Sequence, residues 1–247
     1  MSGEPLFQDL IHRFFRSTNV RSFSCNLQFS NLRFYARLQN IIDNENFKAL
    51  MKERLWKGVL NMNAKGISYV VTKANMTAAF GEERWTAFMA KLAEKDKYFS
   101  TVIMSITAMP VEKLIVLFDE MCKEFFNDDK MQYVKFGKAG AKGVLSPDGP
   151  YKSFMLTKDL KQFVESVLPK VWSMYFDSGV TTARLENNIA HIKITGIQIK
   201  YTYFEYLVMG YFQQAIKMFG KKSIAKKVRS IASGNEDIYF TYELKDS

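Results

Sequence analysis

Apolar residues recur at helical spacing through most of this chain and change to strand-like alternation near its C-terminal end. Residues 67–80 carry the helical pattern, and Gly81 is well placed to end that helix. Glu82 and Glu83 favour the start of a second helix, because negative charge is stabilising at a helix N-terminus. Pro110 suits the first turn of a third. The first half of the pattern therefore predicts packed helices.

The middle of the chain contains regularly spaced glycines. Gly137, Gly140 and Gly143 resemble a phosphate-binding loop only loosely, because the terminal Gly-Lys-Ser/Thr of that motif is absent. We predict instead that these small residues permit close helix packing. Residues 146–150 read Ser-Pro-Asp-Gly-Pro, the strongest loop signal in the chain, and predict a hinge between two halves.

The last third combines helices with strands. Thr157 is the predicted N-cap of a long helix that Pro169 should kink or end. Asn187 and Asn188 suit a tight hairpin with positive φ angles. The elements expected after the long helix are strands over 181–185 and 189–194, a helix over 203–219, and strands over 223–232 and 237–244. Helices before and between grouped antiparallel strands predict an α+β domain over residues 58–247, preceded by a helical and extended segment, residues 1–57.

Residues that carry chemistry are few and scattered. The chain has two histidines, His12 and His191, and two cysteines, Cys25 and Cys122. The histidines fall in different predicted elements, and no carboxylate stands near either at triad or metal spacing. We expect no catalytic residues, no metal and no enzyme activity. The sequence shows no disulfide framework, signal peptide or long apolar stretch, which predicts a cytoplasmic protein.

The junction of the first two predicted helices reads Phe-Gly-Glu-Glu-Arg-Trp at residues 80–85. It resembles the helix–FGEExW–helix opening of H-NOX domains, the haem nitric-oxide and oxygen sensors. The order of elements over residues 58–245 is similar to their superfamily, which includes vinyl-reductase-type domains and TRAPP subunits. Within it, the chain most resembles the uncharacterised myxobacterial paralogue family. The resemblance implies several N-terminal helices followed by a small antiparallel sheet with a packed C-terminal helix.

Two departures from H-NOX domains concern haem. The segment expected to hold their proximal histidine reads Leu-Pro-Lys-Val-Trp at residues 168–172. The stretch that matches their Tyr-x-Ser-x-Arg motif reads Tyr-Thr-Tyr-Phe-Glu at residues 201–205, so Glu205 stands where an arginine would bind propionates. Haem iron also needs an axial ligand such as an imidazole or thiolate. We therefore expect a haem-free protein with no cofactor.

Aromatic side chains of the long helix and the C-terminal helix are candidates for a ligand pocket. The resemblance implies a cavity between these helices, since members of the superfamily accommodate haem, aromatic compounds or acyl chains. The alternative is a filled core, which aromatic and methionine residues at helical spacing usually form. The candidate pocket residues are Phe163, Trp172, Tyr175, Tyr203, Tyr206 and Phe212.

Basic residues are densest around the end of the C-terminal helix and the strand after it. The chain carries a formal net charge of +10 and a sequence pI of about 9.4. The cluster is either a solvated face or an electrostatic surface for an acidic protein, an anionic headgroup or nucleic acid. This predicted basic patch consists of Lys217, Lys221, Lys222, Lys226, Lys227 and Arg229.

These observations lead to one main hypothesis and two alternatives. The main hypothesis is a haem-free bacterial sensory or regulatory module that binds a small apolar ligand, a protein partner, or both. The first alternative is a structural scaffold protein with a filled core. The second is a protein that binds an anionic surface, nucleic acid or membrane, through the basic patch. Assembly as a homodimer stays open at this stage.

Overall fold

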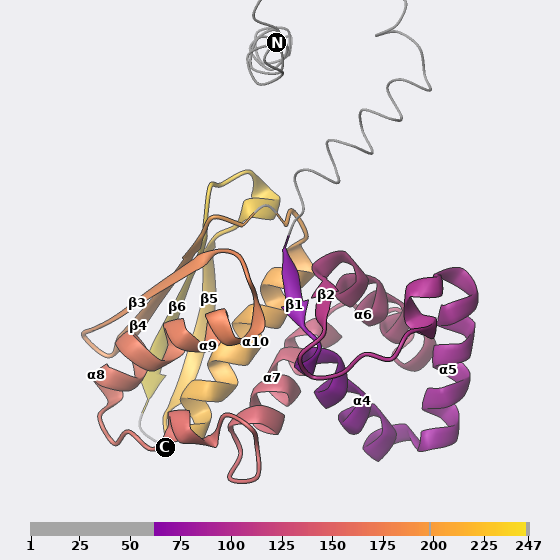
Figure 1. Cartoon of the computed structure of the whole chain (residues 1–247). Helices are drawn as coiled ribbons and strands as arrows, with labels where there is room; N and C mark the ends of the chain where they lie inside the picture. The colour runs from indigo at the N-terminus through magenta and orange to yellow at the C-terminus, as the bar shows by residue number, and fades with distance from the viewer. Residues whose placement is uncertain (1–61, 198, 246–247) are drawn as a thin grey trace, which may run out of the picture. The chain divides into compact units, whose positions relative to one another are not determined.

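The computed structural model describes residues 62–197 and 199–245 (Figure 1). These residues belong to the unit Trp56–Ser247. The helical and extended segment expected over residues 1–57 lies outside the described residues, and so do His12 and Cys25.

The first described part is helical, as the sequence pattern predicts. A short strand, β1 (Asn63–Lys65), pairs antiparallel with β2 (Ala108–Pro110), and the sequence pattern gave no sign of either. Gly81, at φ 88°, separates the first two helices at the predicted junction. The helices of this part are α4 (Ile67–Phe80), α5 (Glu82–Lys95) and α6 (Val111–Phe125), with the 3-10 turn η1 (Lys97–Ser100) after α5.

Two helices, α7 (Gln132–Leu145) and α10 (Thr202–Met218), pack against each other with their backbones in close approach. A Cβ atom on Gly137 would lie 1.9 Å from the carbonyl oxygen of Leu207 on α10. A Cβ atom on Gly210 would lie 2.2 Å from the carbonyl oxygen of Val134 on α7. Each helix therefore presents a glycine to the backbone of the other, which confirms the predicted role in helix packing for Gly137 but not for Gly140.

The predicted long helix is interrupted by a π-helical turn. It runs through α8 (Leu160–Gln162), the π turn η3 (Phe163–Val167) and α9 (Leu168–Tyr175). The prediction that Thr157 caps it is wrong, because the Asp159 side chain accepts the hydrogen bond from the backbone N–H of Gln162. Pro169 does not end the helix. It sits in the first turn of α9, where its missing N–H is tolerated, and the π turn comes just before it.

The C-terminal part forms one antiparallel sheet of four strands in the order β3-β4-β6-β5. Asn187 and Asn188 make the predicted turn between β3 and β4 with φ of 47° and 62°. Helix α9 packs against β3, and α10 packs against β5 (Figure 1). The strands are β3 (Val180–Glu186), β4 (Ile189–Thr195), β5 (Lys222–Arg229) and β6 (Ile238–Lys245).

Strand β5 lies at an edge of this sheet. It ends earlier than predicted, because residues 231–233 form the 3-10 turn η4 (Ile231–Ser233). Its side chains alternate between half-buried and exposed, and Lys222, Ile224, Lys226 and Val228 are the exposed ones. The architecture is the predicted α+β fold of N-terminal helices followed by a small antiparallel sheet with a packed C-terminal helix. No helix in the described ranges combines the length and the apolar character needed to cross a membrane.

We predict that Gly137→Ala lowers the free energy of unfolding by about 1–3 kcal/mol, the usual cost of overpacking a filled interior. The matched control is Gly140→Ala on the same helix. Its Cβ would meet only the Cδ2 atom of Tyr211, at 3.9 Å. Because alanine is a better helix former than glycine by about 1 kcal/mol, we expect Gly140→Ala to keep or slightly raise the free energy of unfolding. Urea unfolding of both variants measures the difference, and equal stabilities would contradict the close approach of α7 and α10.

Candidate functional site

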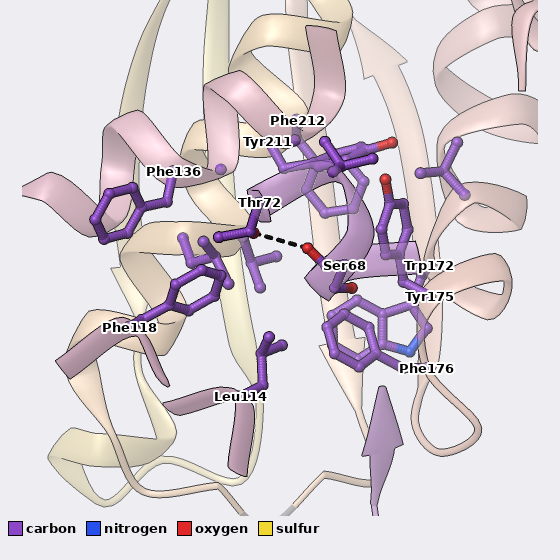
Figure 2. A pocket seen from close by; sticks show the side chains of 16 residues that line it. Ser68, Thr72, Leu114, Phe118, Phe136, Trp172, Tyr175, Phe176, Tyr211 and Phe212 are labelled. Atoms are coloured by element: carbon purple, nitrogen blue, oxygen red, sulfur yellow. Dashed lines mark hydrogen bonds between the residues drawn. The ribbon is translucent and has the colours of Figure 1, made fainter. Parts of the chain in front are cut away.

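A cavity of about 60 Å³ lies among five helices, and its lining is almost entirely apolar (Figure 2). One side is formed by α4, α6 and α7, and the other by α9 and α10. The cavity thus touches both the N-terminal helices and the two helices that pack on the sheet. Its lining residues are Ser68, Val71, Thr72, Leu114, Phe118, Phe136, Gly137, Gly140, Val171, Trp172, Tyr175, Phe176, Leu207, Val208, Tyr211 and Phe212.

Local sequence explains how this wall is built. Trp172 and Tyr175 lie three residues apart on α9, and with Phe176, the residue that follows the helix, they line the cavity. The Trp172 indole is held in place because its Nε1 donates a hydrogen bond of 2.9 Å to the carbonyl oxygen of Ser178. Gly140 contributes to the wall without a side chain, so the space beside it stays open, whereas the space beside Gly137 is filled by the Leu207 backbone.

Two tyrosines of the lining, Tyr175 and Tyr211, carry buried hydroxyl groups. Tyr175 is 8 % exposed. Within the described residues neither hydroxyl makes a hydrogen bond of good geometry to another group, but the two lie close enough to interact with each other. The two rings pack edge to face with centroids 5.1 Å apart. Burial, with a smaller contribution from the neighbouring Tyr211, holds the pKa of Tyr175 well above its usual value, and burial raises the pKa of Tyr211.

The six predicted pocket residues separate into two groups. Trp172, Tyr175 and Phe212 line the cavity. The other three lie away from it, in contacts of their own. Phe163 stacks on Phe219 with ring centroids 4.5 Å apart, Tyr203 packs on Tyr133, and Tyr206 lies beneath the ammonium group of Lys227.

Sequence reasoning missed the α4, α6 and α7 side of the cavity. Leu114 and Phe118 fall on the apolar stripe of α6, which predicts burial but not a partner helix far away in sequence. The glycine spacing on α7 was the one signal that could have located this side. Gly137 permits close contact with α10, and Gly140, one turn on, leaves space.

The predicted basic patch is partly neutralised. Glu205 is fully buried, and the Nζ atom of Lys227 lies 2.8 Å from its Oε2 atom. The same Lys227 ammonium donates to Thr202 Oγ1 at 2.7 Å. Glu205 also accepts hydrogen bonds from the Ser230 hydroxyl at 2.6 Å and from the Ala232 backbone N–H at 3.1 Å. Lys227 is therefore the counter-charge of a buried carboxylate that ties the start of α10 to the end of β5.

Arg229 is paired as well. Its Nε and Nη2 atoms donate to the two carboxylate oxygens of Asp237 at 2.5 and 3.0 Å, and Lys193 lies 3.1 Å from the same carboxylate. The hydrogen bond from Arg229, reinforced by Lys193, lowers the pKa of Asp237. Lys217, Lys222 and Lys226 are exposed, and Lys221 is half-buried. The six residues thus do not form one uniform cationic surface.

The remaining chemistry-bearing residues lie outside the cavity. His191 is on β4, where its Nδ1 atom lies 2.5 Å from the Tyr239 hydroxyl. Cys122 is fully buried in α6, and burial raises its thiol pKa to about 12, which leaves it unreactive at neutral pH. Within the described ranges, no group of three or more His, Cys, Asp or Glu side chains is placed to hold a metal ion.

Comparison with known proteins shows the fold. An H-NOX protein from Shewanella oneidensis in the Fe(II)NO ligation state aligns with a TM-score of 0.58 and 17% identity, covering 74% of this chain and 99% of that chain. A mutant H-NOX domain from the same organism in the Fe(II)CO state gives 0.59 and 18%, with the same coverage. No family model and no curated protein sequence matches. The chain therefore has the H-NOX fold, as its Phe-Gly-Glu-Glu-Arg-Trp junction suggested.

The cavity does not fit haem. Among the described residues, its lining contains no histidine, cysteine or methionine, and no lysine or arginine that could pair with a propionate. Tyrosine ligates iron as the phenolate, and burial disfavours that form of both Tyr175 and Tyr211. The volume of about 60 Å³ is also well below the roughly 300–1,000 Å³ of pockets that hold cofactors or drug-sized ligands.

We predict that Lys227→Gln lowers the free energy of unfolding by about 3–5 kcal/mol, because it leaves the buried Glu205 carboxylate without its counter-charge. The matched control is Lys226→Gln, at the neighbouring exposed position of β5, which should change stability by no more than about 0.5 kcal/mol. Both variants lose one positive charge. Urea unfolding separates them, and similar stabilities would rule out a structural role for Lys227.

Alkaline pH should reveal the two buried phenols. The folded protein keeps both protons where the unfolded chain, with tyrosine pKa near 10, releases them. Keeping these two protons therefore does not change the free energy of unfolding below about pH 10. Above that pH only the unfolded chain releases them, so the free energy of unfolding falls as pH rises further. We expect the double variant Tyr175→Phe/Tyr211→Phe to lose less stability than the wild type between about pH 9 and pH 11. Urea unfolding across that range measures this, and parallel curves would contradict it.

Proposed function

We propose that this protein is a haem-free sensory or regulatory module that binds a small apolar ligand in the cavity between α4, α6 and α7 on one side and α9 and α10 on the other. One observation carries the proposal. The cavity is apolar and is shared by the N-terminal helices and the helices that pack on the sheet. A ligand there contacts both parts at once, so its presence affects how they pack.

The physical basis of signalling is differential affinity. A ligand shifts a conformational equilibrium only by the difference between its binding free energies to the two states. Apolar contact contributes about 25 cal/mol for each Å² buried, so a molecule that fills this small space binds weakly but responds to small changes in cavity shape. A change in packing between α4 and α9 or α10 would be the output, read by a protein partner.

Several parts of this proposed function go further than the likeness in fold. The solved neighbours include H-NOX proteins in Fe(II)NO and Fe(II)CO states. NO and CO are ligands of those proteins, and we do not assign them to this chain. For this chain we propose a non-enzymatic cytoplasmic role, and kinship with the vinyl-reductase-type and myxobacterial paralogue families. Homodimer assembly remains a further form that this module could take. Binding to anionic surfaces is less well supported, since Lys227 and Arg229 are both paired with carboxylates.

Xenon tests the cavity directly, because it binds apolar protein cavities without needing a polar group. With the full chain carrying labelled methyl groups, we expect saturable shifts at the lining residues Val71, Leu114, Val171, Leu207 and Val208. Gly140→Ala, which adds a methyl group to the wall, should weaken xenon binding severalfold. The control Lys135→Ala lies at an exposed position of the same helix and should leave binding unchanged.

Native mass spectrometry and an absorbance scan of protein from a bacterial host complete the test. A small bound mass without a Soret band is the expected result. A Soret band would overturn the haem-free proposal. Absence of saturable xenon shifts would favour the alternative of a filled core and a structural scaffold role.

A further inference from the structure

The loop that joins η1 to β2, residues 101–107, presents three large apolar side chains on the outside of the protein (Figure 1). Val102, Met104 and Ile106 are 84 %, 57 % and 82 % exposed. Ile103, between the first two, is buried at 7 % exposure, so one side chain of the loop points inward while its neighbours point outward. Exposed apolar residues that occur singly are ordinary on protein surfaces, whereas a group of them indicates an interaction site.

Backbone hydrogen bonds hold this loop in place. The Thr107 N–H donates to the Met104 carbonyl oxygen at 3.0 Å, and the Met104 N–H donates to the Thr107 hydroxyl at 2.9 Å. The Gly66 N–H donates to the Thr107 carbonyl oxygen at 2.7 Å, and the Ile67 N–H, at the start of α4, donates to the Ser105 carbonyl oxygen at 2.9 Å. Gly66 permits this approach, because a Cβ atom there would lie 2.0 Å from the Met104 carbonyl oxygen. The exposed side chains are therefore presented by a defined backbone.

The charges around the loop are positive. Residues 97–111 contain no acidic side chain, and Asp96, just before them, is paired with the Lys113 ammonium group. Lys97 is exposed at the start of η1, and Lys65 is exposed on β1, which pairs with β2 directly after the loop. The apolar side chains thus lie between two exposed cations.

We propose that the loop inserts into the headgroup boundary of an anionic lipid membrane. The three apolar side chains reach the upper part of the acyl chains, while Lys65 and Lys97 lie among the headgroups. Burial of apolar side chains at this boundary favours binding, and each lysine near an anionic leaflet adds to it. The loop is separate from the predicted basic patch, two of whose cations are paired with carboxylates, and its insertion does not depend on a ligand in the cavity.

The size and charge of this surface favour a lipid layer over a protein partner. A stable protein interface includes roughly 20–30 residues on each side and needs matched shapes, whereas a bilayer adapts to a few inserted side chains. A second copy of this chain fits poorly. A two-fold contact brings the same patch of both copies together, so Lys65 and Lys97 would face like charges.

Flotation of the full chain with phosphatidylcholine vesicles, with and without phosphatidylserine, tests the proposal. We expect Val102→Ser/Ile106→Ser to weaken binding to the phosphatidylserine vesicles about a hundredfold, or about tenfold for each apolar side chain removed. The matched control is Leu156→Ser/Val180→Ser, which removes two apolar side chains that are 77 % and 63 % exposed on other segments. This control should bind as the wild type does.

A second pair of variants tests the cations. Lys65→Gln/Lys97→Gln should weaken binding to phosphatidylserine vesicles about fivefold for each lysine and leave binding to phosphatidylcholine alone unchanged. Lys222→Gln/Lys226→Gln removes the same charge from exposed positions of β5 and should have little effect. Urea unfolding of each variant shows that it is folded.

Three results would overturn the proposal. The first is vesicle binding by Val102→Ser/Ile106→Ser that equals the wild type, or no binding by the wild type. The second is a loss of binding confined to the β5 variant, which would assign the membrane contact to the basic patch. The third is a wild-type oligomer in size-exclusion chromatography that the loop variant converts to a monomer, because the loop would then bind a second copy of the chain.

Discussion

The close approach of α7 and α10 is the constraint on which the rest of the described structure depends. Carbonyl oxygens of Leu207 and Val134 occupy the space where side chains at positions 137 and 210 would begin. Helix α7 belongs to the wall that α4 and α6 share, while α10 packs on the sheet. The glycine contact therefore fixes the distance between the two sides of the cavity, and the side chains that flank it determine how much space remains.

Local chemistry made much of the fold predictable. Gly81 ends α4 and the Asn187-Asn188 pair turns the hairpin, since both need backbone angles that few residues adopt. Helix boundaries were less predictable where two nearby residues can each act as the N-cap, and Asp159 rather than Thr157 caps the long helix. Pro169 made an irregularity in the long helix predictable, because it lacks the N–H that would bond the carbonyl of residue 165, but the form of that irregularity, a π turn over residues 163–167, was not.

The candidate site was predictable only in part. Periodicity identifies the apolar residues of α10 but not which of its neighbours each one meets, so Tyr203 and Tyr206 were assigned to the cavity although they pack elsewhere. Alternation along β5 separates Lys226 from Lys227, yet the burial of Lys227 against Glu205 depends on a contact across 22 positions. The α4 and α6 walls depend on contacts at still longer range. Patterns within one element carry no information of that kind.

The exposed lysines of β5 have a consequence apart from any ligand. Within the described part of the chain, β5 has a neighbouring strand on one side only, so another strand can pair with its outer edge, although the Ser223 carbonyl already accepts a hydrogen bond from Gln213. Ile224 and Val228 are exposed there and would favour such pairing. Lys222 and Lys226 alternate with them, and charge along an edge strand opposes the addition of a second chain. The same lysines that suggest a binding surface thus oppose edge-to-edge aggregation of the sheet.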